Sequence, residues 1–204
     1  KVTLVVAPAG FGKTTSVVQW LKQREVTCAW YALDEADNNQ KTFYRYMIAA
    51  LGSVIPGLEE QFALFFQSSN EMMTERLITM LANALGKHQG PTTLVLDDYH
   101  LIHTPEIHES LARFIKYMPE SVHLVIISRT SVPLNLAKLQ VSGEVNEVKG
   151  EVLQFDSQEI VALCDKLAIQ CSPSDVLKLE QATEGWAAGL QLVLSKLSHN
   201  RGSI

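Results

Sequence analysis

The sequence predicts an α/β fold in which a parallel β-sheet is flanked by helices and is followed by a small α-helical subdomain. Two observations support this prediction. Short apolar runs rich in β-branched residues alternate with helical patterns as far as Gly150, which is typical of a parallel sheet covered on both faces. Beyond Gly150 only helical patterns follow. We therefore expect one domain over residues 1–150 and a helical lid, or the start of a second domain, over residues 151–204.

The apolar pattern places each element along the chain. The expected strands are residues 2–6, 27–33, 92–96, 122–127 and 144–148. Helical spacing of apolar residues predicts helices between the successive strands, with a break at Pro56-Gly57 between helical pieces. Asp156 and Glu159 have the spacing of a capping box, which predicts that the first helix of the second region begins there.

Composition limits the classes of protein to consider. Apolar residues make up 47% of the 204 residues, and the formal net charge is −5, so we expect a full core and no direct grip on nucleic acid. The chain has neither a signal peptide nor an apolar run of the roughly 20 residues that a membrane helix needs. Its three cysteines lack metal-ligand spacing and predict reduced thiols in a cytoplasmic protein. Because it begins inside a strand and without Met, we expect it to be a piece of a longer protein.

Residues 7–14 have the spacing of a Walker A loop, with Ala7 at the position of the first glycine. Glycines allow successive backbone N–H groups to converge on a phosphate, and the start of the following helix favours an anion. Lys13 would reach the β- and γ-phosphates, and the Thr14 hydroxyl would hold Mg²⁺. The loop thus predicts binding of ATP or ADP with magnesium. The expected nucleotide-binding residues are Ala9, Gly10, Phe11, Gly12, Lys13, Thr14 and Thr15.

A second motif, residues 94–98, is an apolar strand that ends in two carboxylates, as in a Walker B motif. Asp97 would bind Mg²⁺, and Asp98 would polarise the attacking water. The alternative is a turn or a helix N-cap after the strand. Arg129 follows the next strand, where it would sense a γ-phosphate or pair with Asp98 or Asp34, because the carboxyl ends of parallel strands converge on the ligand.

Two other polar groups predict no site. The spacings of His100, His103 and His108 match no common zinc pattern. Residues 34–39 are expected to be a loop that supplies an N-cap to the helix after it.

Five runs of the chain are similar, in order, to those of the STAND class of P-loop NTPases. Among these, they most resemble the large ATP-binding LuxR-type transcription regulators, the group that contains the bacterial maltose-regulon activator. The runs are Ala7–Thr15, Trp30–Asn38, Leu94–Ile102, Ile127–Arg129 and Thr183–Leu190. The third and fifth runs are much more specific than the phosphate loop alone.

The resemblance implies a nucleotide switch with slow ATP hydrolysis. An ADP form would be closed and resting, and an inducer bound to a separate sensor domain would favour ATP and self-association. DNA would be bound only through a helix-turn-helix domain outside these 204 residues. Gly185 and Trp186 align with a Gly-x-Pro motif near the adenine, but Ala187 stands at the proline position.

Two alternatives come from other classes. A small-molecule or nucleotide kinase would share the loop and the fold, but it would usually carry an arginine-rich lid. The cations after residue 150 are instead scattered, at Lys166, Lys178, Lys196 and Arg201. The second alternative is a module that holds ATP as a structural ligand and does not hydrolyse it. Such a module would not need Asp98 and Arg129 as catalytic residues.

Overall fold

The computed structural model describes residues 1–67 and 74–200, with side chains to residue 197, so Arg201 lies outside the described residues. The chain divides into two compact units. The sheet unit comprises Lys1–Val6 and Ser16–Val148, and the helical unit comprises Ala7–Thr15 together with the chain from Lys149 onward. The phosphate loop therefore groups with the helical unit, although it lies within the range expected to be the first domain. The boundary predicted near residue 150 stays a prediction.

The sheet unit is built on a five-stranded sheet with the order β2-β3-β4-β1-β5. The parallel pairs β2–β3, β3–β4 and β4–β1 place Leu124 beside both Val2 and Leu94. This confirms the parallel sheet, and each expected strand is present within one residue of its predicted ends. The bounds are β1 Val2–Val6, β2 Cys28–Ala32, β3 Thr92–Asp97, β4 Val122–Ser128 and β5 Val145–Lys149.

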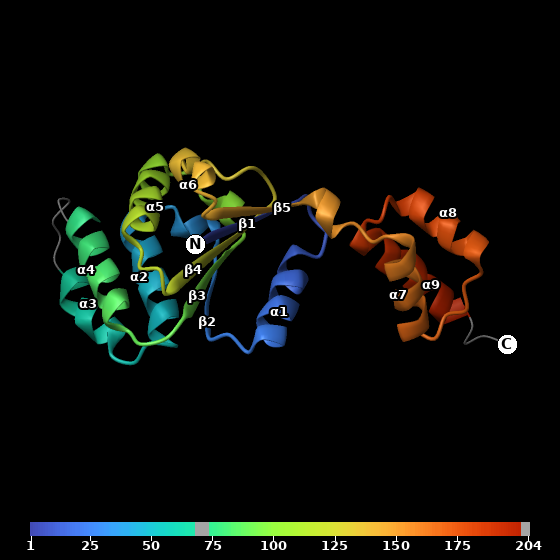
Figure 1. Ribbon diagram of the computed structural model, residues 1–204, viewed down its shortest axis with the longest axis horizontal. Helices are drawn as coiled ribbons and strands as arrows, with labels where there is room; N and C mark the ends of the chain where they lie inside the picture. The colour runs from blue at the N-terminus through green and yellow to red at the C-terminus, as the bar shows by residue number, and fades with distance from the viewer. Residues whose placement is uncertain (68–73, 201–204) are drawn as a thin grey trace. The chain divides into compact units, whose positions relative to one another are not determined.

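Helices cover both faces of this sheet (Figure 1). The connection from β1 to β2 runs in one direction along the sheet, whereas those from β2 to β3 and from β3 to β4 run in the other. Because crossovers between parallel strands are right-handed, α1 and the later helices must lie on opposite faces. Figure 1 shows this arrangement, with α1 on one side and α2 and α5 on the other. The bounds are α1 Lys13–Arg24, α2 Gln40–Gly52, α3 Leu58–Gln67, α4 Thr74–Lys87, α5 Pro105–Tyr117 and the short α6 Ala137–Val141.

The core of the sheet unit is densest around β3, every residue of which is buried. Its central position between β2 and β4 explains why its apolar run is continuous. On one face, α2 and α5 contribute buried aromatic and aliphatic side chains, including Phe43, Met47 and Phe114. Helices α3 and α4 pack against α2 and α5, respectively. The expected break at Pro56-Gly57 is confirmed, because α2 ends at Gly52 and α3 begins at Leu58.

From Gly150 to Asn200, the helical unit consists of a short 3-10 turn, η4, followed by the helices α7, α8 and α9. The bounds are η4 Gly150–Leu153, α7 Ser157–Lys166, α8 Pro173–Thr183 and α9 Ala187–Asn200. The predicted capping box is confirmed, since Asp156 accepts from the N–H of Glu159 and Glu159 accepts in return. A second box, formed by Ser172 and Asp175, opens α8. The helices enclose a small core of their own. In the part of the chain that is described, no helix has the length and apolar character needed to cross a bilayer.

Candidate nucleotide-binding site

The predicted site residues form two groups, one in each unit. The first group is the phosphate loop, residues 7–14, with Thr15 after it and Gly185 and Trp186 nearby in the helical unit. The second group is the acidic strand end, Asp97 and Asp98, together with Arg129, in the sheet unit. The geometry of each group is described within its own unit.

The phosphate loop has the backbone conformation that its glycines predict. Gly10 and Gly12 have φ angles of +81° and +75°, in the left-handed region that an L side chain rarely occupies. Ala7 does not have a positive φ, so its methyl group is tolerated at the first glycine position. Among the described residues, the N–H groups of Gly10 and Phe11 donate no hydrogen bond to the protein. The loop therefore exposes backbone donors suited to an anion.

Lys13 and Thr14 begin α1, directly after this loop. Lys13 is buried, and its ammonium donates a hydrogen bond of 2.9 Å to the carbonyl of Pro8, five residues earlier. Thr14 is exposed in the first turn of the helix. The start of a 12-residue helix carries a partial positive charge. The Lys13 ammonium and the helix start are therefore two positive groups at the end of the loop.

Two residues near the start of α9 donate hydrogen bonds to carbonyl groups of the phosphate loop. The indole N–H of Trp186 donates to the carbonyl of Ala9 at 3.0 Å, and the N–H of Ala188 donates to the carbonyl of Gly10 at 3.0 Å. A tight turn makes this approach possible, because Glu184 and Gly185 have φ angles of +49° and +69° between α8 and α9. The fifth family-like run thus contacts the first.

The acidic strand end places its two carboxylates differently. Asp97 is the last residue of β3, is buried, and accepts the N–H of Asp98 at 2.9 Å. Asp98 has a left-handed backbone with φ +57° and a half-exposed side chain. It occupies the N-cap position of the short 3-10 helix η3 (Tyr99–Leu101), but its side chain makes no capping bond. This geometry argues against the simple cap and leaves the Asp98 carboxylate available. Left-handed backbone at a residue other than glycine is a strain that concentrates at functional sites.

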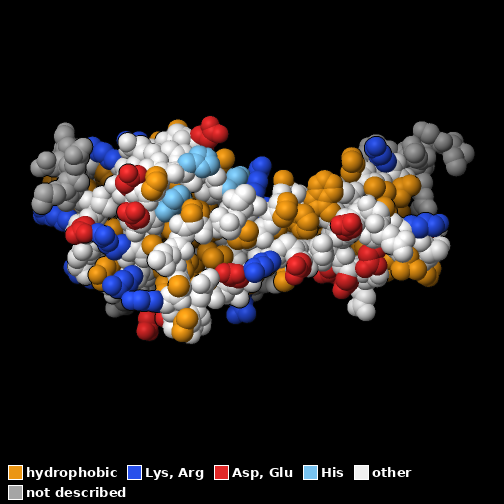
Figure 2. Space-filling view, turned by 90° about the horizontal axis from the view of Figure 1, so that it is seen from above, with side chains coloured by type: hydrophobic (Ala, Val, Ile, Leu, Met, Phe, Trp, Pro, Cys, Tyr) orange, Lys and Arg blue, Asp and Glu red, His pale blue; other side chains and the backbone are white. Residues whose placement is uncertain are grey.

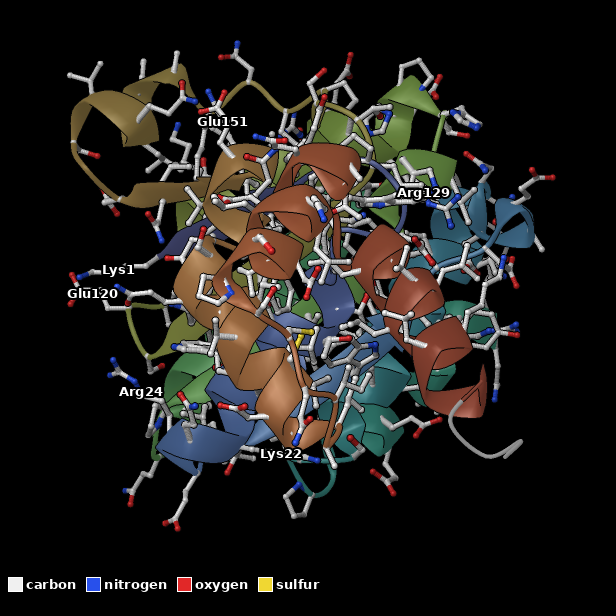
Figure 3. All side chains as sticks on the ribbon, turned by 90° about the vertical axis from the view of Figure 1, so that its right-hand side faces the viewer. Lys1, Lys22, Arg24, Glu120, Arg129 and Glu151 are labelled. Atoms are coloured by element: carbon white, nitrogen blue, oxygen red, sulfur yellow. The ribbon has the colours of Figure 1, made fainter. Side chains whose placement is uncertain are left out.

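Arg129 lies just after β4, and its guanidinium Nε is 3.9 Å from Asp98 Oδ1. The imidazole of His100 lies 3.7 Å from the same oxygen. The Arg129 side chain is about half exposed, so this long ion pair contributes little stability and is easily exchanged for another anion. Figure 3 shows Arg129 well separated from Lys22 and Arg24, which project from the far end of α1.

Asn38 is a residue whose position the sequence did not indicate. Its side-chain amide donates to the carbonyl of Leu101 and accepts from the N–H groups of His103 and Thr104, at 2.6–3.2 Å. It therefore ties the loop after β2 to the loop after β3, which carries Asp98. The predicted N-cap of α2 is also confirmed, at Asn39. The second family-like run could have indicated Asn38, because it ends at this residue.

Two other features of the described residues are a group of histidines and a groove. Several histidines lie on one face of the sheet unit (Figure 2). Across residues 1–67 and 74–197, however, no three His, Cys, Asp or Glu side chains are grouped as metal ligands would be. A groove of about 640 Å³ between α4 and α5 is lined by Glu75, Arg113 and Tyr117 among others, and it contains none of the predicted site residues.

The residues present fit a nucleotide and a magnesium ion. The N–H groups of Gly10 and Phe11, which donate to no protein atom among the described residues, can donate to a phosphate. The Thr14 hydroxyl and the Asp97 carboxylate are hard oxygen donors of the kind that Mg²⁺ prefers.

The fold and the loop define a P-loop NTPase domain, and comparison with known proteins shows the family. The chain belongs to the AAA domain family (AAA_22), which matches residues 1–137. Among curated proteins, it is similar to the HTH-type transcriptional regulator MalT of Yersinia enterocolitica, with 35% identity over 194 residues. The MalT of Serratia proteamaculans is 37% identical over the same length. Each alignment covers 95% of this chain and 21% of the relative, so the chain spans about a fifth of their length.

Among solved structures, the Aeropyrum pernix ORC1 protein in complex with DNA has a TM-score of 0.48 and 13% identity. The superposition covers 98% of this chain and 55% of that protein. The likeness is too weak to bear on function.

Proposed function

We propose that this chain is an ATP-binding regulatory switch domain that hydrolyses ATP slowly and forms part of a larger transcription activator. The observation that carries the proposal is the phosphate loop. The loop has two left-handed glycines and, among the described residues, two backbone N–H groups, those of Gly10 and Phe11, that donate to no protein atom. It leads into the start of α1, where Lys13 is buried. Such a combination binds phosphate groups of a nucleotide through backbone donors and one point charge.

In this proposal the loop residues bind and orient the phosphates. The N–H groups from Ala9 to Thr15 surround the β-phosphate. Lys13, which donates to the Pro8 carbonyl, exchanges that acceptor for β- and γ-phosphate oxygens. A phosphate oxygen carries far more negative charge than a carbonyl, so the exchange is favourable.

The acidic strand end supplies the hydrolytic groups. Thr14 and Asp97 would hold Mg²⁺, which would neutralise charge on the phosphates. Asp98 would orient and polarise the attacking water, and Arg129, whose ion pair with Asp98 is long, would contact the γ-phosphate. Asp98 is a half-exposed carboxylate, and its ion pairs with His100 and Arg129 are long, at 3.7 and 3.9 Å, so it can accept a proton from water.

The activity of the whole protein is proposed by analogy with its relatives, which are regulators of the helix-turn-helix type. We expect an inducer to bind a sensor domain, and DNA to bind a separate domain, both outside these 204 residues. The acidic balance of the chain, with a net charge of −5, agrees with the absence of direct DNA contact. ATP would favour self-association, and hydrolysis would return the switch to rest in the cytoplasm.

The first test is to denature the purified chain gently and to identify by chromatography any nucleotide that it releases. About one ADP per chain would support a resting switch that retains its product. An empty chain that binds neither ATP nor ADP would overturn the proposal. Steady-state turnover gives the second test, because a rate of ~10 per second or more would be that of a metabolic enzyme. Phosphate transfer to an acceptor in a small-molecule panel would favour the kinase alternative.

A further inference from the structure

We propose that Trp186 is a positioning residue for nucleotide phosphates, and that it acts together with the backbone N–H of Ala188. We call these two donors the clasp. The clasp would hold the phosphate loop in its binding conformation from the side opposite to the ligand. This inference rests on the proposed function, and it assigns Trp186 a role at the phosphates rather than at the adenine.

The first step is the geometry of the peptide bond. The clasp holds the carbonyl oxygens of Ala9 and Gly10, each at 3.0 Å. The chain has no cis peptide bonds, and in a trans peptide the C=O and the following N–H point in opposite directions within one plane. Fixing these two carbonyls therefore also fixes the N–H groups of Gly10 and Phe11. Neither of these two N–H groups donates to a protein atom among the described residues.

The second step is steric. A Cβ built at Gly10 would lie 2.5 Å from Trp186 Nε1 and 2.8 Å from the Ala188 Cβ. At Gly12, by contrast, the nearest atom is the Ala187 Cβ at 3.9 Å. The absence of a side chain at Gly10 therefore makes room for the clasp.

The third step is the rigidity of the clasp itself. The N–H of Trp186 donates to the carbonyl of Thr183 at 2.8 Å, and the N–H of Phe155 donates to the carbonyl of Gly185 at 2.9 Å. A Cβ at Gly185 would lie 2.5 Å from the Phe155 carbonyl oxygen, so only glycine allows this pairing. The clasp is thus anchored to the end of α8 and to the segment before α7. Donors that are already ordered before a ligand arrives lose less conformational entropy when they bind it.

The test removes the indole N–H and keeps the shape of the side chain. Trp186→Phe is one variant, and replacement of Trp186 by benzothienylalanine, an isostere without the N–H, is the second. Trp20→Phe, on α1 of the sheet unit, is the matched control. Calorimetry would measure the dissociation constant and stoichiometry of ADP and of inorganic pyrophosphate for each protein, and thermal unfolding would verify the fold.

We expect both Trp186 variants to bind ADP and pyrophosphate about 5- to 10-fold more weakly, as loss of one hydrogen bond implies, with stoichiometry unchanged. The Trp20→Phe control should match the parent chain. Weakened ADP with unchanged pyrophosphate would place the indole at the base and overturn the clasp. Unchanged binding of both, in a parent chain that binds both, would also overturn it and leave the proposed function intact. A parent chain that binds neither ligand would overturn the proposed function and the clasp together.

Discussion

The phosphate loop and the acidic strand end place their polar groups by different means. In the loop, the proposed binding function rests on backbone N–H groups, whose direction is restricted by left-handed glycines and, as we propose, by the donors of Trp186 and Ala188. At the acidic strand end, the proposed function rests on side chains. The buried strand β3 positions Asp97, and Asp98 has a left-handed backbone. The phosphate loop thus depends on glycines, which lack side chains, whereas the acidic strand end depends on charged side chains.

This difference predicts different responses to substitution. Ordinary side-chain substitutions do not remove a backbone N–H. We therefore expect phosphate binding by the loop to be weakened by substitution of Lys13 and of Trp186, which donates to the loop. If Asp98 is the base, its replacement should abolish most of the hydrolysis, because no neighbouring backbone group can substitute for a base. Binding should therefore depend on the loop, and hydrolysis on the strand end.

The largest effect is expected for Asp98→Asn. The amide keeps the size of the side chain but cannot accept a proton, so ATP hydrolysis should fall ~100-fold or more, while ATP affinity changes little. Single-turnover hydrolysis and calorimetry would measure the two quantities. Asp34→Asn is the matched control, because Asp34 follows the neighbouring strand β2 and caps a 3-10 helix, a role that asparagine also fills. Equal hydrolysis by Asp98→Asn and the parent chain would favour the module that holds ATP as a structural ligand.

A smaller effect, on binding, is expected for Lys13→Ala. Removal of the charge-assisted contact to phosphate should weaken ATP by roughly 2 kcal/mol, or ~30-fold in the dissociation constant. Lys22→Ala removes a lysine from the exposed last turn of the same helix and should bind ATP as the parent chain does. If calorimetry gave the same affinity for Lys13→Ala and the parent, the loop would not be the phosphate site.

The third prediction concerns the stability of the acidic strand end. Asn38→Ala removes side-chain bonds to Leu101, His103 and Thr104, and should lower the free energy of unfolding by about 2 kcal/mol. Asn39→Ala is the neighbouring control. It removes the N-cap of α2 and a weak bond from the Thr42 hydroxyl to the same oxygen, for which ~1 kcal/mol is expected. Urea titration of both variants would measure the difference, and a larger loss for Asn39→Ala would contradict the proposed tie between the two loops.

The fold was largely predictable because its signals are local. A strand buried on both faces, such as β3, leaves a continuous apolar run, and a capping box such as Asp156 with Glu159 leaves two residues at a fixed spacing. The grouping of the phosphate loop with the helical unit was not predictable. It depends on the contact between residues 9 and 186, which are remote in sequence, and no periodicity records such a contact.

The candidate site was predictable to the extent that residue type determines chemistry. Lys13, Asp97 and Asp98 follow from the motifs, although their roles stay predictions. The positions of Asn38 and Trp186 did not follow, because an asparagine in a polar loop and a half-exposed tryptophan have many structural uses. Their partners are mostly backbone groups, which are identical at every position and leave no trace in the sequence.

The smallest expected effect is a pH dependence that originates in the sheet unit. Burial lowers the pKa of His123, and burial together with the neighbouring His103 lowers the pKa of His108, whose Nδ1 lies 2.8 Å from the Tyr99 hydroxyl. As pH falls below the unfolded-state pKa of about 6.5, the unfolded chain takes up protons before the folded chain does, and stability decreases. Urea titrations at pH 7.5 and 5.5 should therefore give a lower free energy of unfolding at the acidic pH. His123→Gln should reduce this difference. A parent chain more stable at pH 5.5 would contradict the assignment, because the sign of the slope follows directly from the lowered pKa values.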